Sequence, residues 1–136
     1  NWFQILGKEL ELAVLVGIDK DDQWSGIAPW CIDRTQPLLN KLRFLGSGDA
    51  CSDYLRLIAS GENHDEFNRV AIDWLIENIG CPQTLGRIDV IDLEGISTED
   101  PKTNYLSEVF GANGMKHHTT ALEGGGRSNF LPPGKN

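Results

Sequence analysis

The sequence predicts a helix-rich α+β fold, in which a central apolar helix over residues 65–79 packs against a small sheet. Three observations predict it: an apolar segment at 65–79 with helix start and stop signals, a run rich in β-branched residues at 87–96, and a glycine- and proline-rich composition after residue 110. An all-α bundle is the alternative fold. A chain of 136 residues suits one domain. We therefore expect a globular helix-rich domain over residues 1–110 and a C-terminal arm over 111–136.

Residues 2–18 fit two interpretations. A helix would gather six apolar residues on one face, namely Trp2, Phe3, Leu6, Leu10, Ala13 and Val14. The apolar run at residues 12–16, which ends at Gly17, is instead typical of a strand. We favour a helix that gives way to an extended end. A polar loop is expected over residues 19–29.

Two further helices are expected between residues 35 and 61. In the first, Thr35 is the candidate N-cap, and Pro37 lies in the first turn, where its missing N–H costs little. Its apolar face consists of Leu38, Leu39, Leu42 and Leu45, and Gly46 follows its last turn. In the second, Asp49 is the candidate cap and Gly61 marks the end. Its apolar stripe has helical spacing and consists of Cys51, Tyr54, Leu55 and Ile58.

The helix over residues 65–79 has the strongest signals. Asn63 and Glu66 have the spacing of a capping box, and Asp65 and Glu66 lie in the first turn, where the helix dipole favours negative charge. Apolar residues cover about two-thirds of the helical wheel, which predicts a helix nearly surrounded by other elements. Gly80 and Pro82 mark its end.

Residues 87–96 are expected to form a strand paired with residues 12–16, because one strand needs a neighbour for its backbone hydrogen bonds. Thr103 or Asn104 is the candidate cap of a last short helix before Gly111. Six glycines and two prolines among residues 111–136 predict a tail or an irregular arm.

The charge is strongly negative and unevenly distributed. Twenty acidic residues and twelve lysines and arginines give a formal charge of −8. Nucleic acid is therefore a poor partner, because phosphate binding depends on Lys and Arg. No apolar run reaches the roughly 18 residues that a membrane span needs. Residues 64–100 hold nine acids and two bases, a net −7, whereas residues 101–136 are slightly basic.

The sequence predicts a small acidic interaction protein of a binding, inhibitor or immunity type, without catalytic activity. An acidic face would meet a protein partner with a basic surface, which speeds association and selects the partner by the sign of its charge. The predicted binding residues are Glu66, Asp73, Glu77, Asp92 and Glu94. No cofactor and no metal site are predicted. A homo-oligomer formed through the C-terminal arm is a further expectation.

The alternative is a small hydrolase or a metal-dependent nuclease. Asp89, followed by Asp100, Pro101 and Lys102, resembles the D…(D/E)-x-K pattern of restriction-endonuclease-like folds over about 14 residues. The resemblance implies that Asp89 and Asp100 hold Mg²⁺ and that Lys102 lies near the attacking water. Pro101 would interrupt the strand that this family uses at that place. The net acidity also opposes a nucleic-acid substrate.

The cysteines allow one other form of hydrolase and indicate the compartment. Cys31 or Cys51 would act as nucleophile, with one of three histidines, His64, His117 or His118, as the base. The three cysteines include no C-x-x-C pair, and their odd number argues against a disulfide framework. No signal peptide is visible in the given sequence. We expect a cytoplasmic protein.

Overall fold

The computed structural model describes residues 9–47, 57–96, 101–122 and 125–132. A mixed seven-stranded sheet dominates these residues, and the described part contains two α-helices. The helix-rich prediction is therefore wrong, and so is its all-α alternative. The sheet is formed from both ends of the chain, including segments that we expected to be helix or irregular arm.

Six strands lie side by side and a seventh, short strand joins them at one point. The order across the sheet is β1 (Leu10–Ile18), β2 (Trp24–Gln36), β3 (Leu39–Phe44), β5 (Val90–Ile96), β7 (Gly125–Leu131) and β6 (Lys116–Leu122). The short β4 (Ile58–Ala59) pairs with β2. The pairing of β3 with β5 is parallel, and the other pairs are antiparallel. Thus β1 and β6 form the two edges.

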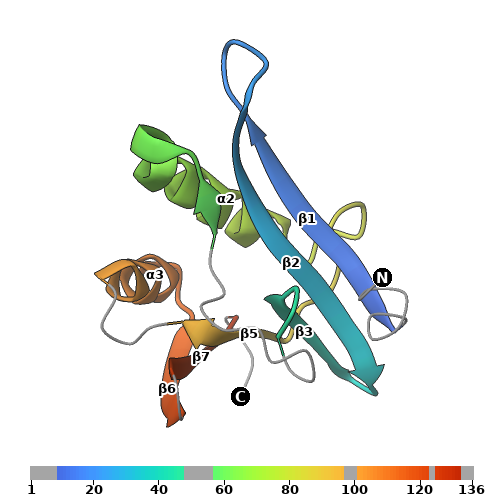
Figure 1. The fold of residues 1–136 in the computed structure, drawn as a ribbon. Coiled ribbons are helices and arrows are strands. Elements are labelled where there is room, and N and C mark those ends of the chain that lie inside the picture. Colours follow the sequence, from blue (N-terminus) through green and yellow to red (C-terminus); the bar gives the residue numbers. More distant parts are fainter. Residues whose placement is uncertain (1–8, 48–56, 97–100, 123–124, 133–136) are drawn as a thin grey trace.

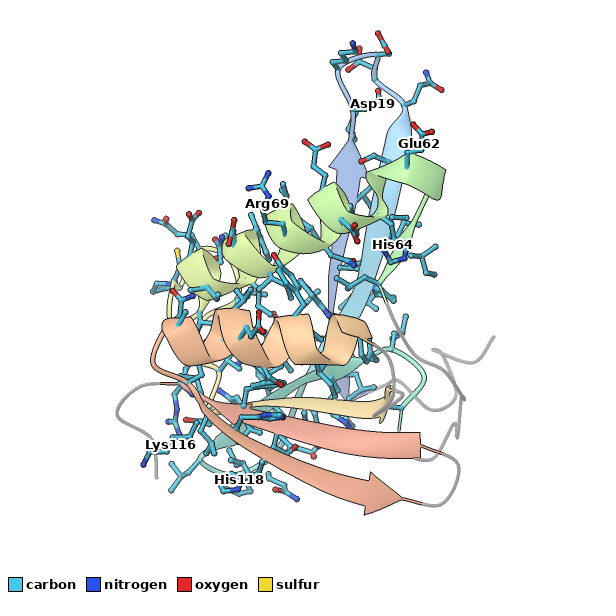
Figure 2. All side chains as sticks on the ribbon, turned by 90° about the vertical axis from the view of Figure 1, so that its left-hand side faces the viewer. Asp19, Glu62, His64, Arg69, Lys116 and His118 are labelled. Carbon is cyan, nitrogen blue, oxygen red and sulfur yellow. The ribbon has the colours of Figure 1, made fainter. Side chains whose placement is uncertain are left out.

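The molecule has two layers, with both helices on one face of the sheet (Figures 1 and 2). The first helix, α2 (His64–Asn78), follows the 3₁₀ turn η2 (Gly61–Asn63), and the second, α3 (Pro101–Ala112), connects β5 to β6. Alternate residues of the strands face these helices and form one core. Its sheet side includes Trp30, Leu42, Ile91 and Phe130, and its helix side includes Phe67, Ile72, Leu75 and Phe110.

The predicted helix over residues 65–79 is confirmed as α2, which spans His64–Asn78. Gly80 follows it with a φ of +84°, the left-handed conformation that its glycine was expected to supply. The helix is not surrounded, however. It buries one face on the sheet, while Val70 on the other side is 48% exposed. Some apolar residues of α2 are therefore not buried against the sheet, because they line a groove on the surface.

The predictions for the N-terminal half fail at two described segments. Residues 10–18 form β1 where we favoured a helix, and the polar loop shrinks to a turn because β2 begins at Trp24. The helix expected after Thr35 is a β-hairpin, in which Pro37 and Leu38 connect β2 to β3. The second expected helix falls largely on residues 48–56, outside the described residues; at its end Ile58 is extended in β4.

The C-terminal half matches the predictions in part. The strand expected at residues 87–96 is present as β5, but its neighbours are β3 and β7 instead of residues 12–16. The last short helix is present as α3. The segment expected to be an irregular arm supplies β6 and β7, and Phe130 of β7 is fully buried. A homo-oligomer through this segment stays a prediction.

Neither helix in the described part of the chain combines the length and the apolar composition that crossing a membrane requires.

Candidate functional site

Helix α2 lies across the β1–β2 hairpin and packs against it at two glycines. Gly17 and Gly26 are paired in the register of β1 and β2. A Cβ atom added at Gly17 would lie 2.7 Å from the ring of Phe67, and one added at Gly26 would lie 2.5 Å from it. A Cβ atom essentially never comes this close to a non-bonded atom, so glycine fits at both positions without displacing the Phe67 ring. The paired glycines therefore let the helix approach the hairpin closely.

A groove of about 620 Å³ runs between this part of α2 and the outer strand β1. Strand β1 contributes Leu15, Val16, Gly17 and Ile18, and the helix contributes Phe67, Val70 and Trp74. These seven residues provide apolar surface, and Val70 remains 48% exposed. We call this feature the α2 groove. Apolar concave surfaces of this size are the usual places where proteins hold ligands or partner segments.

Acidic side chains border the α2 groove along the helix. Glu66 lines the groove directly. By the helical period, Asp73 and Glu77 fall on the same stripe of α2 as Glu66, next to Val70. All three acids are exposed. Arg69 Nη1 lies 3.8 Å from Asp73 Oδ2, so this arginine partly offsets the negative charge of Asp73. Residues 61–78 contain five acids and one arginine, so this side of the molecule stays negative.

The turn between β1 and β2 adds negative charge at the same end of the groove. Asp19 and Asp21 line the groove together with Lys20, and Asp22 is exposed beside them. The Asp19 Oδ1 atom accepts hydrogen bonds from the backbone N–H groups of Asp21 at 2.8 Å and Gln23 at 3.0 Å, which holds the turn in shape. Figure 2 shows Asp19 at the hairpin tip, on the same side of the molecule as Glu62 and Arg69.

The structure thus brings together three of the five predicted binding residues, Glu66, Asp73 and Glu77. The other two lie on β5, separated from β1 by β2 and β3. Asp92 is only 2% exposed and is paired in register with Arg43 of β3. The backbone of Glu94 pairs with Arg127, and its side chain lies outside the described residues. A binding role for Asp92 or Glu94 stays a prediction and forms no part of the α2 groove.

The residues of the nuclease alternative are placed only in part. Asp89 is 5% exposed, and its carboxylate accepts hydrogen bonds from Arg87 Nε at 2.9 Å and from the Asn40 backbone N–H at 2.8 Å. The Asp89 carboxylate therefore links the residues just before β5 to the start of β3. Asp100 lies outside the described residues, and Lys102 lies in α3 without a described side chain. Among the side chains that are described, no group of three or more His, Cys, Asp or Glu could hold a metal ion.

The cysteine–histidine alternative is not assembled among the described residues. Burial raises the pKa of the Cys31 thiol to about 11, with Arg43 lowering it and Asp33 raising it further. This thiol is therefore protonated and unreactive near neutrality. In register, Cys31 faces away from the helices, opposite Arg43, whereas the ring of exposed His117 stacks on buried Phe130, with ring centroids 4.5 Å apart.

The other histidines do not complete such a pair. Burial and the neighbouring His118 lower the pKa of His117. His64 Nδ1 lies 3.0 Å from Asn68 Nδ2, one turn along α2. His118 lies on β6, which is separated from β2 by three strands. Cys51 lies outside the described residues.

Sequence reasoning missed one prominent feature, an aliphatic row along the outer strand. It consists of Leu12, Val14, Val16 and Ile18, which are 36–60% exposed on the face opposite the helices. The sequence signal was weak, because Ala13 and Leu15, which pack on the core, are apolar as well, so residues 12–16 show no alternation of apolar and polar side chains. Ala13 and Val14 also fit one face of a helix, so the run alone did not show which side chains would be exposed.

Comparison with known proteins finds no matching family model, no matching curated protein and no matching solved structure.

Proposed function

We propose that this protein is a non-catalytic interaction protein, of the binding, inhibitor or immunity type, that holds a basic segment of a protein partner in the α2 groove. The observation that carries the proposal is an apolar groove bordered on two sides by acids, those of α2 and those of the hairpin turn. The apolar floor supplies the burial that drives association. The acidic border selects lysine- or arginine-rich partners and speeds their encounter.

The remaining surface features fit this proposal. Figure 2 shows Lys116 and His118 on β6, on the side of the molecule opposite Asp19, so these two side chains do not cover the groove. The two described cysteines, Cys31 and Cys81, are free thiols. Free thiols suit a reducing compartment, which supports a cytoplasmic setting as part of the proposal.

The test measures binding of a fluorescent peptide of alternating lysine and valine to the full chain and to charge-reversal variants. We expect Glu66→Lys and Glu77→Lys each to weaken binding by about threefold to tenfold, and we expect added salt to weaken wild-type binding. Both residues are exposed, so their variants should keep the wild-type circular dichroism spectrum.

The matched control is Glu108→Lys, which makes the same charge change at an exposed position of α3. It should leave the affinity nearly unchanged. If Glu108→Lys weakens binding as much as Glu66→Lys, the peptide responds to net charge alone and the α2 groove is not the site. If the peptide shows no salt-dependent binding at all, the proposed function is wrong.

A further inference from the structure

The outer edge of β1 offers backbone groups for pairing. Strand β1 pairs with β2 on one side, and no described strand pairs with its other side. Proteins usually block such an edge with proline, lysine or a bulge. Along Leu10–Ile18 there is no proline and no lysine, and the register shifts only at Gly17/Ile18. The one charged residue of β1, Glu11, forms a salt bridge with Arg34, in which Oε2 and Nε are 2.8 Å apart. Among the described residues, nothing therefore pairs with the central part of this edge.

Two different surfaces flank this edge. On the face opposite the helices, the edge is bordered by the exposed row Leu12, Val14, Val16 and Ile18. On the helix face it is bordered by the α2 groove with its acids, whose lining also includes Val16 and Ile18 at the end of β1 near the hairpin turn. Side chains alternate between the two faces of a strand. A strand laid along β1 would therefore place every second side chain beside the aliphatic row and the others beside Glu66, Asp73 and Glu77.

We infer that the partner binds by β-strand addition: an extended segment that alternates apolar with lysine or arginine residues pairs with β1. Its apolar side chains lie beside Leu12, Val14 and Val16, and its basic side chains enter the α2 groove. This inference depends on the proposed function and specifies the shape and the sequence pattern of the partner. Main-chain hydrogen bonds to β1 supply part of the affinity, and the alternating charge supplies the specificity.

Charge complementarity favours this occupant over a second copy of the chain. Two β1 strands paired about a twofold axis would place both α2 helices on the same face of a continuous sheet. Their acidic stripes would then approach each other, and each chain already carries a charge of −8. Like charges brought together in this way oppose association. A basic strand would instead be attracted to the acidic side chains of α2.

The test uses two N-methylated forms of a lysine–valine peptide of about seven residues, the usual length of a strand. One form carries methyl groups on the odd-numbered amides, the other on the even-numbered amides. A strand at a sheet edge directs only one of these two sets toward its neighbour. We expect one form to bind like the parent peptide and the other to lose about tenfold or more in affinity. Backbone amides of β1 should also exchange more slowly with solvent when the parent peptide is bound.

A pair of protein variants tests the apolar half of the contact. Val14→Lys changes an aliphatic residue of the β1 row that is 44% exposed, and Ile58→Lys makes the same kind of change at a 56% exposed position on β4. Val14→Lys should weaken the parent peptide several-fold, and Ile58→Lys should not. If both variants behave alike, the row does not contact the peptide and the inference is wrong.

The outcomes separate the two proposals. If both N-methylated peptides bind as well as the parent, and Glu66→Lys still weakens them, strand addition is excluded while the proposed function stands. If no form of the peptide binds, both fail. If the peptide-free chain sediments as a dimer whose β1 amides are already protected, a second copy occupies the edge and the inference is overturned.

Discussion

At the scale of single residues, the contact between Phe67 and the glycine pair decides how α2 meets the hairpin. Gly17 and Gly26 face each other across two strands, and the ring of Phe67 fills the space that their missing side chains leave. A buried aromatic ring contributes much of the stability at such a contact. The position of the α2 groove follows from this contact, because Phe67 is both the anchor and part of the groove lining.

Gly26→Ala should therefore destabilise the protein. The added methyl group would lie 2.5 Å from Phe67, and overpacking of this kind costs about 1–3 kcal/mol of unfolding free energy. Urea denaturation measures the loss. Gly111→Ala is the matched control, because no atom lies within 4 Å of the added methyl group and alanine favours a helix. Equal stability of the two variants would contradict the close packing of Phe67 on Gly26.

The buried thiol of Cys31 should produce a measurable pH dependence at alkaline pH. Its pKa is about 11 in the folded protein against an ordinary value of 9.0, mainly because of burial. Below pH 9 both states keep the proton. Between pH 9 and pH 11 the unfolded chain loses it while the folded chain retains it, so the free energy of unfolding falls as pH rises through this window.

Replacement of the thiol isolates this contribution. Cys31→Ala should unfold with a shallower loss of stability between pH 9 and pH 11 than the wild type. Cys81→Ala is the control and should keep the wild-type loss, because hydrogen bonds, first that from the Thr84 side chain, lower the pKa of Cys81 instead of raising it. An unchanged slope in Cys31→Ala would show that this thiol is not buried as described.

At the scale of elements, the turn between β2 and β3 shows why leucine spacing misled the prediction. Leu39 and Leu42 have helical spacing, and Pro37 suits the first turn of a helix as well as the second position of a β-turn. Leu38 adopts a φ of +65°, which fits the third position of a type II turn and not a helix. The hairpin is favoured because β3 can then join both β2 and β5 and bury Leu42 and Phe44.

Leu38→Gly should stabilise the hairpin. A non-glycine residue in the left-handed region costs about 1–2 kcal/mol, and the Leu38 side chain is 82% exposed, so little packing is lost. The Leu38 carbonyl, which accepts a hydrogen bond from Arg87 at 2.6 Å, is retained. Thermal denaturation should show a higher midpoint. Leu39→Gly, at the first residue of β3, should lower the midpoint. A lower midpoint for both variants would contradict the described turn.

Helix α2 is the element that the sequence predicts best. Its start, its end and its acidic stripe all follow from local signals, namely acids in the first turn, a glycine after the last turn and a period of 3.6 residues. These local signals do not show which other elements the apolar face of α2 contacts. One part of the arc packs on the sheet through Ala71, Ile72 and Leu75, and another part, with Val70, is left at the groove.

At the scale of the whole molecule, strands from the N-terminal and C-terminal parts of the chain belong to one sheet. Strands β1–β3 come from the first third of the chain, β5 from a point about two-thirds of the way along it, and β6–β7 from the last quarter. The parallel contact between β3 and β5 joins the two halves. Figure 1 shows that the β6–β7 hairpin lies below α3, where it continues the sheet away from β1. The C-terminal hairpin therefore completes the core.

A chain that ends at Gly114 should consequently fail to fold. It lacks Phe130, which is fully buried and whose ring lies 4.5 Å from that of Phe110. Loss of a buried phenylalanine alone costs about 3–5 kcal/mol, a large part of the stability of a typical domain. Circular dichroism and urea titration should show no cooperative transition. A truncated chain with the wild-type unfolding midpoint would instead support an independent arm.

Two point variants in the full-length chain refine this test. Phe130→Ala should lose about 3–5 kcal/mol. His118→Ala, at an exposed position of β6, should change stability by less than about 0.5 kcal/mol.

The sequence by itself determined the acidic character of the protein, the helix α2 with its acidic stripe, the strand β5 and the short helix α3. Each depends on short-range signals such as caps, turn residues, charge and local periodicity. Only the tertiary structure decided that residues 10–18, 39–44, 116–122 and 125–131 are strands, that Asp92 is buried, and that an aliphatic row and an acidic groove flank the same edge. Strand pairing joins residues far apart along the chain, so its free energy is not encoded in any one segment.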